Sequence, residues 1–265
     1  MCRLVAYLGK PVFMETLLVR PPSSLIAQSL SAREAKTVVN GDGCGVGWYG
    51  ELDEPGVYRG TLPAWSDANL ASLCRQIKAR LFLAHVRSAT SGEVATANCH
   101  PFTAARHLFM HNGQIGDYDR LRRTVDAMIP DALYPLRRGT SDSEAIFLAA
   151  MGRGLEKTPR AALAGTLADI MAAMRKAGTG SPLRFAAILS DGKRLQAFRW
   201  ASDGKPPSMY WRTMPGGVTI ASEPFDEEAE AWNTMPPSTV LTIEADGGME
   251  LGSFECGEQG AVCAA

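Results

Sequence analysis

The chain has 265 residues, of which 46% are hydrophobic and 21% charged, and its formal net charge is −1. This length and composition are typical of a globular protein with a sizeable core, arranged as one large domain or two small ones. The balance of charge excludes the basic footprint of a nucleic-acid-binding protein, and no apolar stretch approaches the roughly 20 residues of a membrane-spanning helix.

The first part of the chain predicts a strand, a helical segment and a glycine-rich loop. Residues 3–8 form a short apolar run that ends at Gly9-Lys10-Pro11, which predicts a buried strand. The run is too short for the roughly 7–15 apolar residues of a signal-peptide core. Residues 23–35 begin with helix-like spacing of apolar side chains. Residues 40–50 are rich in glycine and lead into a predicted strand that ends at Trp48-Tyr49.

Helices and strands follow one another through the middle of the chain. Residues 67–80 place apolar side chains on one face, which predicts a helix. Residues 81–86 and 107–110 are compact apolar strands. Residues 140–151 begin with Thr-Ser-Asp-Ser-Glu, which is typical of a helix N-terminus, and residues 159–176 form a second helix rich in Ala, Leu and Met.

The last third of the chain, from residue 183, predicts short strands separated by turns. Hairpins and runs of like elements favour the α+β class over a parallel βαβ repeat. Because no repeat, low-complexity tract or linker interrupts the sequence, we expect residues 1–265 to form a single domain. The turn signals are Asp191-Gly192, Asp203-Gly204, Pro215-Gly216-Gly217 and Asp246-Gly247-Gly248.

Cys2 is a candidate nucleophile. Removal of Met1 would give Cys2 a free α-amine with a reference pKa of about 7.7–8.0, against about 8.5 for the thiol, so the amine is suited to take the thiol proton near neutral pH. One residue then supplies both nucleophile and base. The alternative is a buried structural cysteine at the start of a strand. The six cysteines are scattered along the chain, which favours a cytoplasmic setting with reduced thiols.

Cys2 also opens a series of motifs. They are Met1-Cys2-Arg3, His85-Val86-Arg87-Ser88-Ala89-Thr90, Asn98-Cys99-His100-Pro101-Phe102, His111-Asn112-Gly113 and Thr140-Ser141-Asp142-Ser143-Glu144. The set and its order resemble the class II glutamine amidotransferase domain, an N-terminal-nucleophile hydrolase. The sequence looks most like the stand-alone members, which include the ergothioneine-pathway γ-glutamyl hydrolases and related uncharacterised amidotransferase-like proteins. The resemblance implies a four-layer αββα sandwich of two antiparallel sheets.

The resemblance also implies how a glutamyl substrate is held. Arg87 resembles the family's carboxylate-binding arginine, whose planar fork suits a bidentate grip on the α-carboxylate. Asp142 resembles the acceptor for the α-ammonium, and we expect Ser88 and Thr90 to add hydrogen bonds to the substrate. The alternatives are a surface arginine at a strand end and an ordinary acid in the first turn of a helix; Asp142 can hold both roles.

Asn112 and Gly113 resemble the family's oxyanion hole. The side-chain amide of Asn112 and the main-chain N–H of Gly113 would stabilise the charge that develops on the attacked carbonyl, and losing such a donor typically costs about 10²–10³ in rate. The alternative for Asn-Gly is a type I′ turn. We expect His100 and His111 to be structural or to position loops, and neither to act as the base.

Two other patterns admit a different chemistry. Residues 40–47 lack the Lys-Ser/Thr of a phosphate-binding loop and precede a strand, so we interpret them as tight backbone packing near the nucleophile. In this segment Cys44 stands where the related hydrolases commonly carry a tryptophan. His107 and His111 have the spacing of metal ligands, but in a strand four residues span roughly 13 Å, which is too far to share one metal.

These observations predict hydrolysis of a γ-glutamyl amide bond, in glutamine or a γ-glutamyl metabolite, through a Cys2 thioester that releases glutamate. We expect a small-molecule substrate, and no cofactor, metal, nucleic-acid or membrane partner. One alternative is a glutaminase subunit that supplies ammonia to a separate synthase partner. The other is a non-catalytic glutamyl-binding module. A homo-oligomer is compatible with each of the three.

Overall fold

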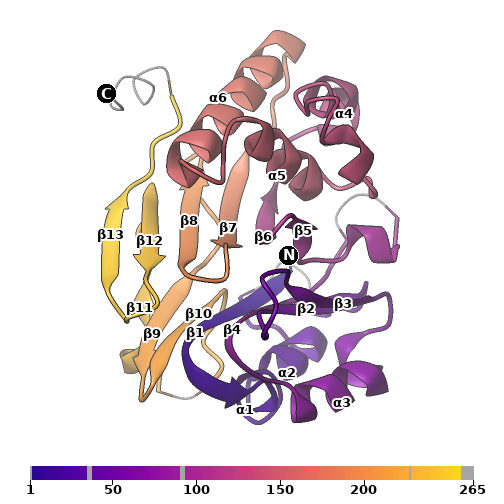
Figure 1. Ribbon diagram of the computed structural model, residues 1–265. Coiled ribbons are helices and arrows are strands. Elements are labelled where there is room, and N and C mark those ends of the chain that lie inside the picture. Colours follow the sequence, from indigo (N-terminus) through magenta and orange to yellow (C-terminus); the bar gives the residue numbers. More distant parts are fainter. Residues whose placement is uncertain (1, 35–37, 90–92, 227, 258–265) are drawn as a thin grey trace.

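Two antiparallel β-sheets lie at the centre of the structure, and helices cover their outer faces (Figure 1). The structure is a computed structural model that describes residues 2–34, 38–89, 93–226 and 228–257. Every strand pairing within the two sheets is antiparallel.

The first sheet has seven strands in the order β11-β9-β10-β1-β4-β2-β3. Its central strand β1 carries the N-terminus and lies between β10 and β4. The strands are β1 (Arg3–Phe13), β2 (Cys44–Trp48), β3 (Gly56–Gly60), β4 (Lys78–Val86), β9 (Tyr210–Met214), β10 (Gly217–Ala221) and β11 (Asn233–Thr234).

The second sheet has six strands in the order β13-β12-β8-β7-β6-β5. Its neighbours in space are mostly neighbours in sequence, as the predicted hairpins require. The strands are β5 (Phe102–Ala104), β6 (His107–Gln114), β7 (Arg184–Ser190), β8 (Leu195–Ala201), β12 (Thr239–Ile243) and β13 (Met249–Ser253).

Helices pack on the outer face of each sheet (Figure 1). One set covers the first sheet and another covers the second, and short 3₁₀ turns connect the elements. The first set is α1 (Glu15–Leu18), α2 (Leu25–Leu30) and α3 (Ala68–Gln76); the second is α4 (Tyr118–Asp126), α5 (Asp142–Gly152) and α6 (Pro159–Ala177); the turns are η1 (Ala64–Ser66), η2 (Thr96–Asn98), η3 (Tyr134–Leu136) and η4 (Ala229–Ala231).

The central strands are buried on both faces, which explains their continuous apolar sequence. In β1, Leu4, Ala6 and Leu8 point into the core between the two sheets, whereas Val5 and Tyr7 point into the core between the first sheet and its helices. This alternation follows from the two-residue period of a strand. Three apolar cores therefore separate four layers, and the predicted αββα sandwich of the α+β class is confirmed.

Several predicted boundaries are wrong. Strand β1 does not end at Leu8 but continues to Phe13, and its register with β4 shifts between Leu8 and Val12. Pro11 is tolerated there because an irregular stretch does not need its missing N–H. Helix α2 ends at Leu30, within the predicted 23–35 segment, of which residues 35–37 lie outside the described part.

The helix predicted for residues 67–80 also ends too late. Asp67 caps α3, and its Oδ1 accepts hydrogen bonds from Asn69 and Leu70. After Gln76 the chain enters β4, where exposed Lys78, buried Ala79 and exposed Arg80 alternate as a strand requires. The helical spacing of apolar residues continues past Gln76 into the strand, so periodicity alone does not show where the helix ends.

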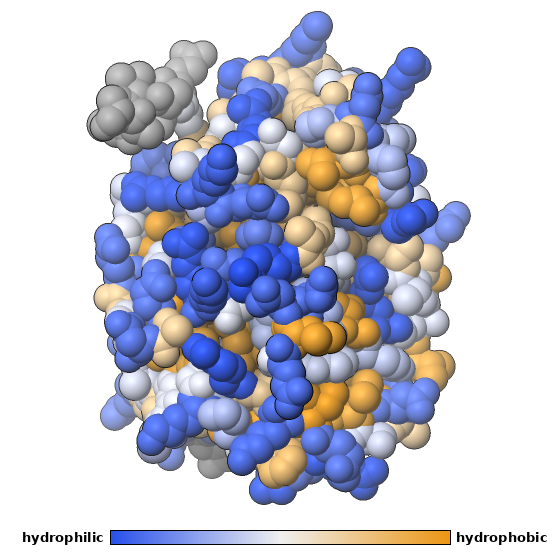
Figure 2. All heavy atoms as spheres, viewed as in Figure 1, coloured by the Kyte–Doolittle hydropathy of each residue, from blue (hydrophilic) through white to orange (hydrophobic). Residues whose placement is uncertain are grey.

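The surface mixes polar and apolar side chains. On the face shown in Figure 2, hydrophilic residues predominate and the apolar ones form separate patches. Among the residues that the structure describes, no helix combines the length and the apolar character needed to cross a membrane.

Candidate active site

The predicted site residues lie where the ends of strands from both sheets meet. Cys2 immediately precedes β1, whose Arg3 pairs with Val86 at the end of β4, so Cys2 lies beside the segment that follows β4. Strand β6 of the second sheet packs against both β1 and β4. The predicted oxyanion motif on β6 is thereby brought to the same end of the interface between the sheets.

The sulfur of Cys2 is held against the main chain of Ser88. The Ser88 N–H donates to Sγ at 3.3 Å, and the thiol lies 3.5 Å from the Ser88 carbonyl oxygen as a donor. Burial raises the pKa of the Cys2 thiol, while the Ser88 hydrogen bond and the positive charges of Arg87 and Arg3 act in the opposite direction. The resting sulfur is therefore a protonated thiol that needs a base.

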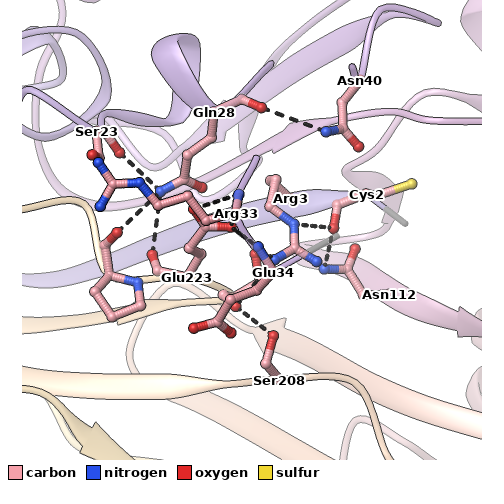
Figure 3. A network of polar contacts seen from close by, with 12 residues as sticks. Cys2, Arg3, Ser23, Gln28, Arg33, Glu34, Asn40, Asn112, Ser208 and Glu223 are labelled. Atoms are coloured by element: carbon pink, nitrogen blue, oxygen red, sulfur yellow. Dashed lines mark hydrogen bonds and ion pairs between the residues drawn. The ribbon is translucent and has the colours of Figure 1, made fainter. Parts of the chain in front are cut away.

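The carbonyl oxygen of Cys2 accepts two side-chain hydrogen bonds (Figure 3). Arg3 Nε donates at 2.8 Å and Asn112 Nδ2 donates at 3.0 Å. Since a carbonyl oxygen has two lone pairs, this acceptor is fully used. The main chain of Cys2 is thus fixed by groups from both sheets.

A pocket opens beside Cys2 and is lined by most of the residues that the motifs predict. Besides Cys2, its walls include Arg87, Ser88, Gly113 and Asp142. Asn112 reaches the same place through its bond to the Cys2 carbonyl. The structure therefore brings these six residues together. The remaining predicted site residue, Thr90, lies outside the described residues.

Arg87 is buried, with 5% of its surface exposed, so it is not the surface arginine of the alternative interpretation. Its Nη1 donates to the Glu93 carbonyl oxygen at 3.1 Å. Two hydrogen bonds join the main chain of Arg87 to the glycine-rich segment. The Arg87 N–H donates to the Gly43 carbonyl oxygen at 2.8 Å, and the Asp42 N–H donates to the Arg87 carbonyl oxygen at 3.0 Å.

The glycine-rich segment packs as tightly as predicted. Gly43 adopts a φ of +112°, and a Cβ there would lie 2.6 Å from the sulfur of Cys99. A Cβ on Gly45 would lie 2.2 Å from the carbonyl oxygen of His100. Cys44 is buried with its thiol toward Asp67 and is not among the residues that line the pocket, so the departure from tryptophan at this position lies outside the pocket wall.

Asp142 is the first residue of α5, directly after the N-cap Ser141. Its Oδ2 accepts a hydrogen bond from the Ile115 N–H at 2.9 Å, and Ser143 Oγ lies 3.3 Å from its Oδ1. The acid is therefore both a first-turn residue, favourable near a helix N-terminus, and part of the pocket wall.

Asn112 and Gly113 lie inside β6, paired with Ala186 and Phe185 of β7, so the type I′ turn is excluded. Gly113 has a φ of +148°, and a Cβ at this position would lie 1.9 Å from the Arg184 carbonyl oxygen. Only glycine fits here. The predicted strand was too short because it stopped at Met110, before these polar residues.

His107 and His111, which have the spacing of metal ligands in the sequence, have separate surroundings. His111 Nδ1 lies 2.8 Å from Ser143 Oγ, and its Nε2 lies 3.3 Å from the Arg184 carbonyl oxygen. His107 lies instead beside Asp191 in a small cavity at the other end of β6. No group of three or more His, Cys, Asp or Glu side chains within the described ranges is arranged to hold a metal ion.

Two buried groups at the site were not assigned a role from the sequence. Asn98 ties two loops together: its Oδ1 accepts from the N–H groups of Thr140 and Ser141, and its Nδ2 donates to the Glu93 carbonyl. Its position in a quoted motif was the only signal. Glu223 pairs with Arg3 at 3.4 Å, and no local pattern marks it because it lies 220 residues further along the chain.

The fold is that of the N-terminal-nucleophile hydrolases. A family model described as class-II glutamine amidotransferases matches residues 18–206. The chain belongs to the class II glutamine amidotransferase family. Cys2 lies before the matched range.

Three similar proteins cover nearly the whole chain. "Probable glutamine amidotransferase DUG3" of Saccharomyces cerevisiae is 30% identical over 92% of this chain and 82% of its own length. The gamma-glutamyl-hercynylcysteine sulfoxide hydrolase of Mycolicibacterium smegmatis is 33% identical over 92% of this chain and 96% of its own. The solved structure of a glutamine aminotransferase class-II domain protein from Silicibacter pomeroyi is 36% identical, with a TM-score of 0.78 and coverage of 96% of this chain and 99% of that one.

Proposed function

We propose that this protein hydrolyses the γ-glutamyl amide bond of a small molecule and releases glutamate. The observation that carries the proposal is the placement of Cys2. Its sulfur borders a pocket whose walls include a buried arginine and an aspartate, and its own main chain is held by Asn112. A nucleophile, an opposite charge for each end of an amino acid and a polar donor are thus gathered at one place.

The two charged residues account for recognition of the glutamyl group. Arg87 would pair with the α-carboxylate, for which a planar guanidinium is well suited. Asp142 would accept from the α-ammonium, and Ser88 and Thr90 would add hydrogen bonds. The side chain of the substrate would then extend toward Cys2 and present its γ-carbonyl carbon to the sulfur.

In the first half of the reaction, the α-amine of Cys2 takes the thiol proton and Sγ forms a bond to the γ-carbonyl carbon. The carbonyl oxygen becomes an oxyanion, which the Asn112 amide and the Gly113 N–H stabilise. The C–N bond then breaks, the leaving amine takes a proton from the α-ammonium of Cys2, and a Cys2 thioester remains.

In the second half, water replaces the amine. The same α-amine removes a proton from water as the oxygen attacks the thioester carbon. The oxyanion forms again at the same donors, the C–S bond breaks, and the thiol is restored as glutamate leaves. The base exists only after Met1 has been removed, so the proposal requires the processed chain.

The names of two relatives bear on the group that leaves. The hydrolase from M. smegmatis is named for a γ-glutamyl metabolite, which favours direct hydrolysis of such a compound. The S. cerevisiae relative is named as a glutamine amidotransferase, which supports the second candidate, a glutaminase that supplies ammonia to a separate partner.

We also propose that the protein is cytoplasmic. The five cysteines of the described residues are free thiols, as expected in a reducing compartment.

Cys2→Ala tests the proposal. The processed wild-type protein, Cys2→Ala and the matched control Cys74→Ala, a buried cysteine in α3, are assayed for glutamate release. The substrates are free glutamine, γ-glutamyl peptides and γ-glutamyl thio-histidine derivatives. We expect Cys2→Ala to release no glutamate and Cys74→Ala to retain activity; equal turnover by Cys2→Ala would refute the nucleophile. Intact mass must show loss of Met1, and an active protein that retains it would contradict the base.

A further inference from the structure

Asn112 has its amide group between two partners that together fix which way the group points. Its Nδ2 lies 3.0 Å from the Cys2 carbonyl oxygen, and its Oδ1 lies 3.2 Å from His85 Nε2. A carbonyl oxygen only accepts hydrogen bonds, so the amide atom beside Cys2 must be the nitrogen. The amide oxygen therefore faces His85.

This orientation determines the state of His85. Because Oδ1 only accepts, Nε2 of His85 must carry a hydrogen and donate it. Burial lowers the pKa of His85 to about 3, so the ring is neutral and the hydrogen on Nε2 leaves Nδ1 bare. Within the described part of the chain, buried Nδ1 has no hydrogen-bond partner, in agreement with this tautomer.

The two sheets bring His85 and Asn112 together. In β4, Leu81 and Leu83 point into the core between the sheets, and His85 follows them with the same two-residue period. The same holds in β6, where Asn112 follows Met110. His85 is 1% exposed and its ring lies against that of His100, with 4.1 Å between ring centroids, so it has little freedom to turn away.

We propose that His85 is a positioning residue, which donates from Nε2 to Asn112 Oδ1 and holds the amide with Nδ2 toward the reacting carbonyl. An amide nitrogen has two hydrogens. One bonds to the Cys2 carbonyl oxygen, and the other is left for the oxyanion. Without His85 only the Cys2 carbonyl oxygen orients the amide, so the amide is held less firmly and presents its second hydrogen to the oxyanion less precisely. This inference rests on the proposed role of Asn112 as an oxyanion donor.

The direct test replaces the donor. His85→Met removes the hydrogen-bond donor and keeps an adaptable apolar side chain, whereas His85→Gln keeps an N–H donor. We expect His85→Met to lower kcat by about 10- to 100-fold, less than the roughly 10²–10³ of losing an oxyanion donor, with an unchanged KM. His85→Gln should recover part of the loss. His107→Met, a buried histidine on β6 away from the pocket, is the control and should keep its kcat.

A double variant separates positioning from a general packing defect. In the Asn112→Ala background, His85→Met should cause no further loss of kcat, because the group that it orients is gone. If the fold losses of kcat caused by Asn112→Ala and by His85→Met multiply in the double variant, the inference is overturned. If Cys2→Ala and Asn112→Ala lower kcat but His85→Met does not, only the role of His85 fails. If Cys2→Ala is active, the proposed function itself fails.

A measurement on the wild-type protein covers the case in which His85→Met does not fold. Nitrogen-15 NMR of the histidine rings reports which nitrogen carries the hydrogen. We expect His85 to be neutral with its hydrogen on Nε2 between pH 6 and pH 8. A neutral ring with its hydrogen on Nδ1 would leave Nε2 unable to donate and would overturn the proposal.

Discussion

Glu223 neutralises the most deeply buried arginine near the site, and Glu223→Gln removes that charge at almost constant size. Arg3 has no exposed surface, and Glu223 Oε2 lies 3.4 Å from its Nη1. The carboxylate also accepts from the N–H groups of Arg33 and Glu34, at 2.9–3.1 Å. In Figure 3 this cluster lies directly beside Cys2 and Asn112.

The expected loss of stability follows from the burial of both partners. Removing one partner of a buried ion pair typically costs about 3–5 kcal/mol, because it leaves an uncompensated charge in a low dielectric. Arg3 Nη1 also donates to the Ser222 carbonyl oxygen at 3.3 Å, but this neutral acceptor does not balance the charge, and Nη2 lacks a hydrogen-bond partner among the described residues. A chain of this size should then show a melting temperature lowered by about 6–20 °C.

The assay is urea unfolding of the wild type, Glu223→Gln and a matched exposed pair. Arg153 and Asp169 form an ion pair with side chains 43% and 50% exposed, so Asp169→Asn should cost only about 0–1 kcal/mol. Equal losses from Glu223→Gln and Asp169→Asn would refute the importance of burial.

The double variant Arg3→Met with Glu223→Gln adds a second test. Since it removes the unpaired charge, it should be more stable than Glu223→Gln alone. The double variant should nevertheless be less active than the wild type, because its residue 3 no longer donates to the Cys2 carbonyl oxygen. The single variant Arg3→Met is measured as well. If its loss of stability and that of Glu223→Gln simply add in the double variant, the charge of Arg3 is not what destabilises Glu223→Gln.

Three further predictions test the pH dependence, the substrate contact and the backbone. Burial lowers the folded-state pKa of all four histidines, to about 3 for His85. Their contribution to the free energy of unfolding is therefore fully present above about pH 6.5 and is lost as the pH falls toward the folded pKa. Each histidine accounts for up to about 1.4 kcal/mol per pH unit. Urea unfolding at pH 7.5 and pH 5.5 measures this, and equal stability would contradict it. Arg87→Lys should raise KM about tenfold or more with a smaller effect on kcat, because lysine cannot grip a carboxylate with two bonds; steady-state kinetics with an unchanged KM would remove the carboxylate role. Gly113→Ala should destabilise by at least about 1–3 kcal/mol, because its Cβ would meet the Arg184 carbonyl in a backbone conformation that side chains disfavour, whereas Gly180→Ala, with open space around it, should not.

The sequence was most informative where one local pattern determines the structure. The apolar run of β1 and the capping residues of α5 each specify an element through neighbouring residues, and both elements are present. The motifs pointed to Cys2, Arg87 and Asp142, which the fold brings to one pocket. Thr90 is not described, and the roles of the site residues, like the single domain over residues 1–265, stay predictions.

The contacts that hold the site join residues far apart in sequence, and no local pattern announces them. Arg3 meets Glu223, and Asn112 meets both Cys2 and His85, only because strands of two sheets pack face to face. Helix ends were missed for a related reason. A helical spacing of apolar residues can continue into a strand, and only the pairing with a neighbouring strand shows where the helix stops.

A nucleophile at the start of a mature chain is less constrained than an internal residue, because no peptide bond precedes it. In the proposed mechanism Met1 has been removed, so no preceding residue would hold Cys2 and its main chain would be anchored from the C-terminal side alone. The structure supplies the missing constraint through side chains: Arg3 and Asn112 saturate the Cys2 carbonyl oxygen, and the Ser88 N–H holds the sulfur. In the proposed mechanism the α-amine must reach both the thiol and the leaving group, which requires a fixed residue with an unobstructed N-terminus. Donors on the carbonyl side meet both needs, because they hold Cys2 without covering its amine.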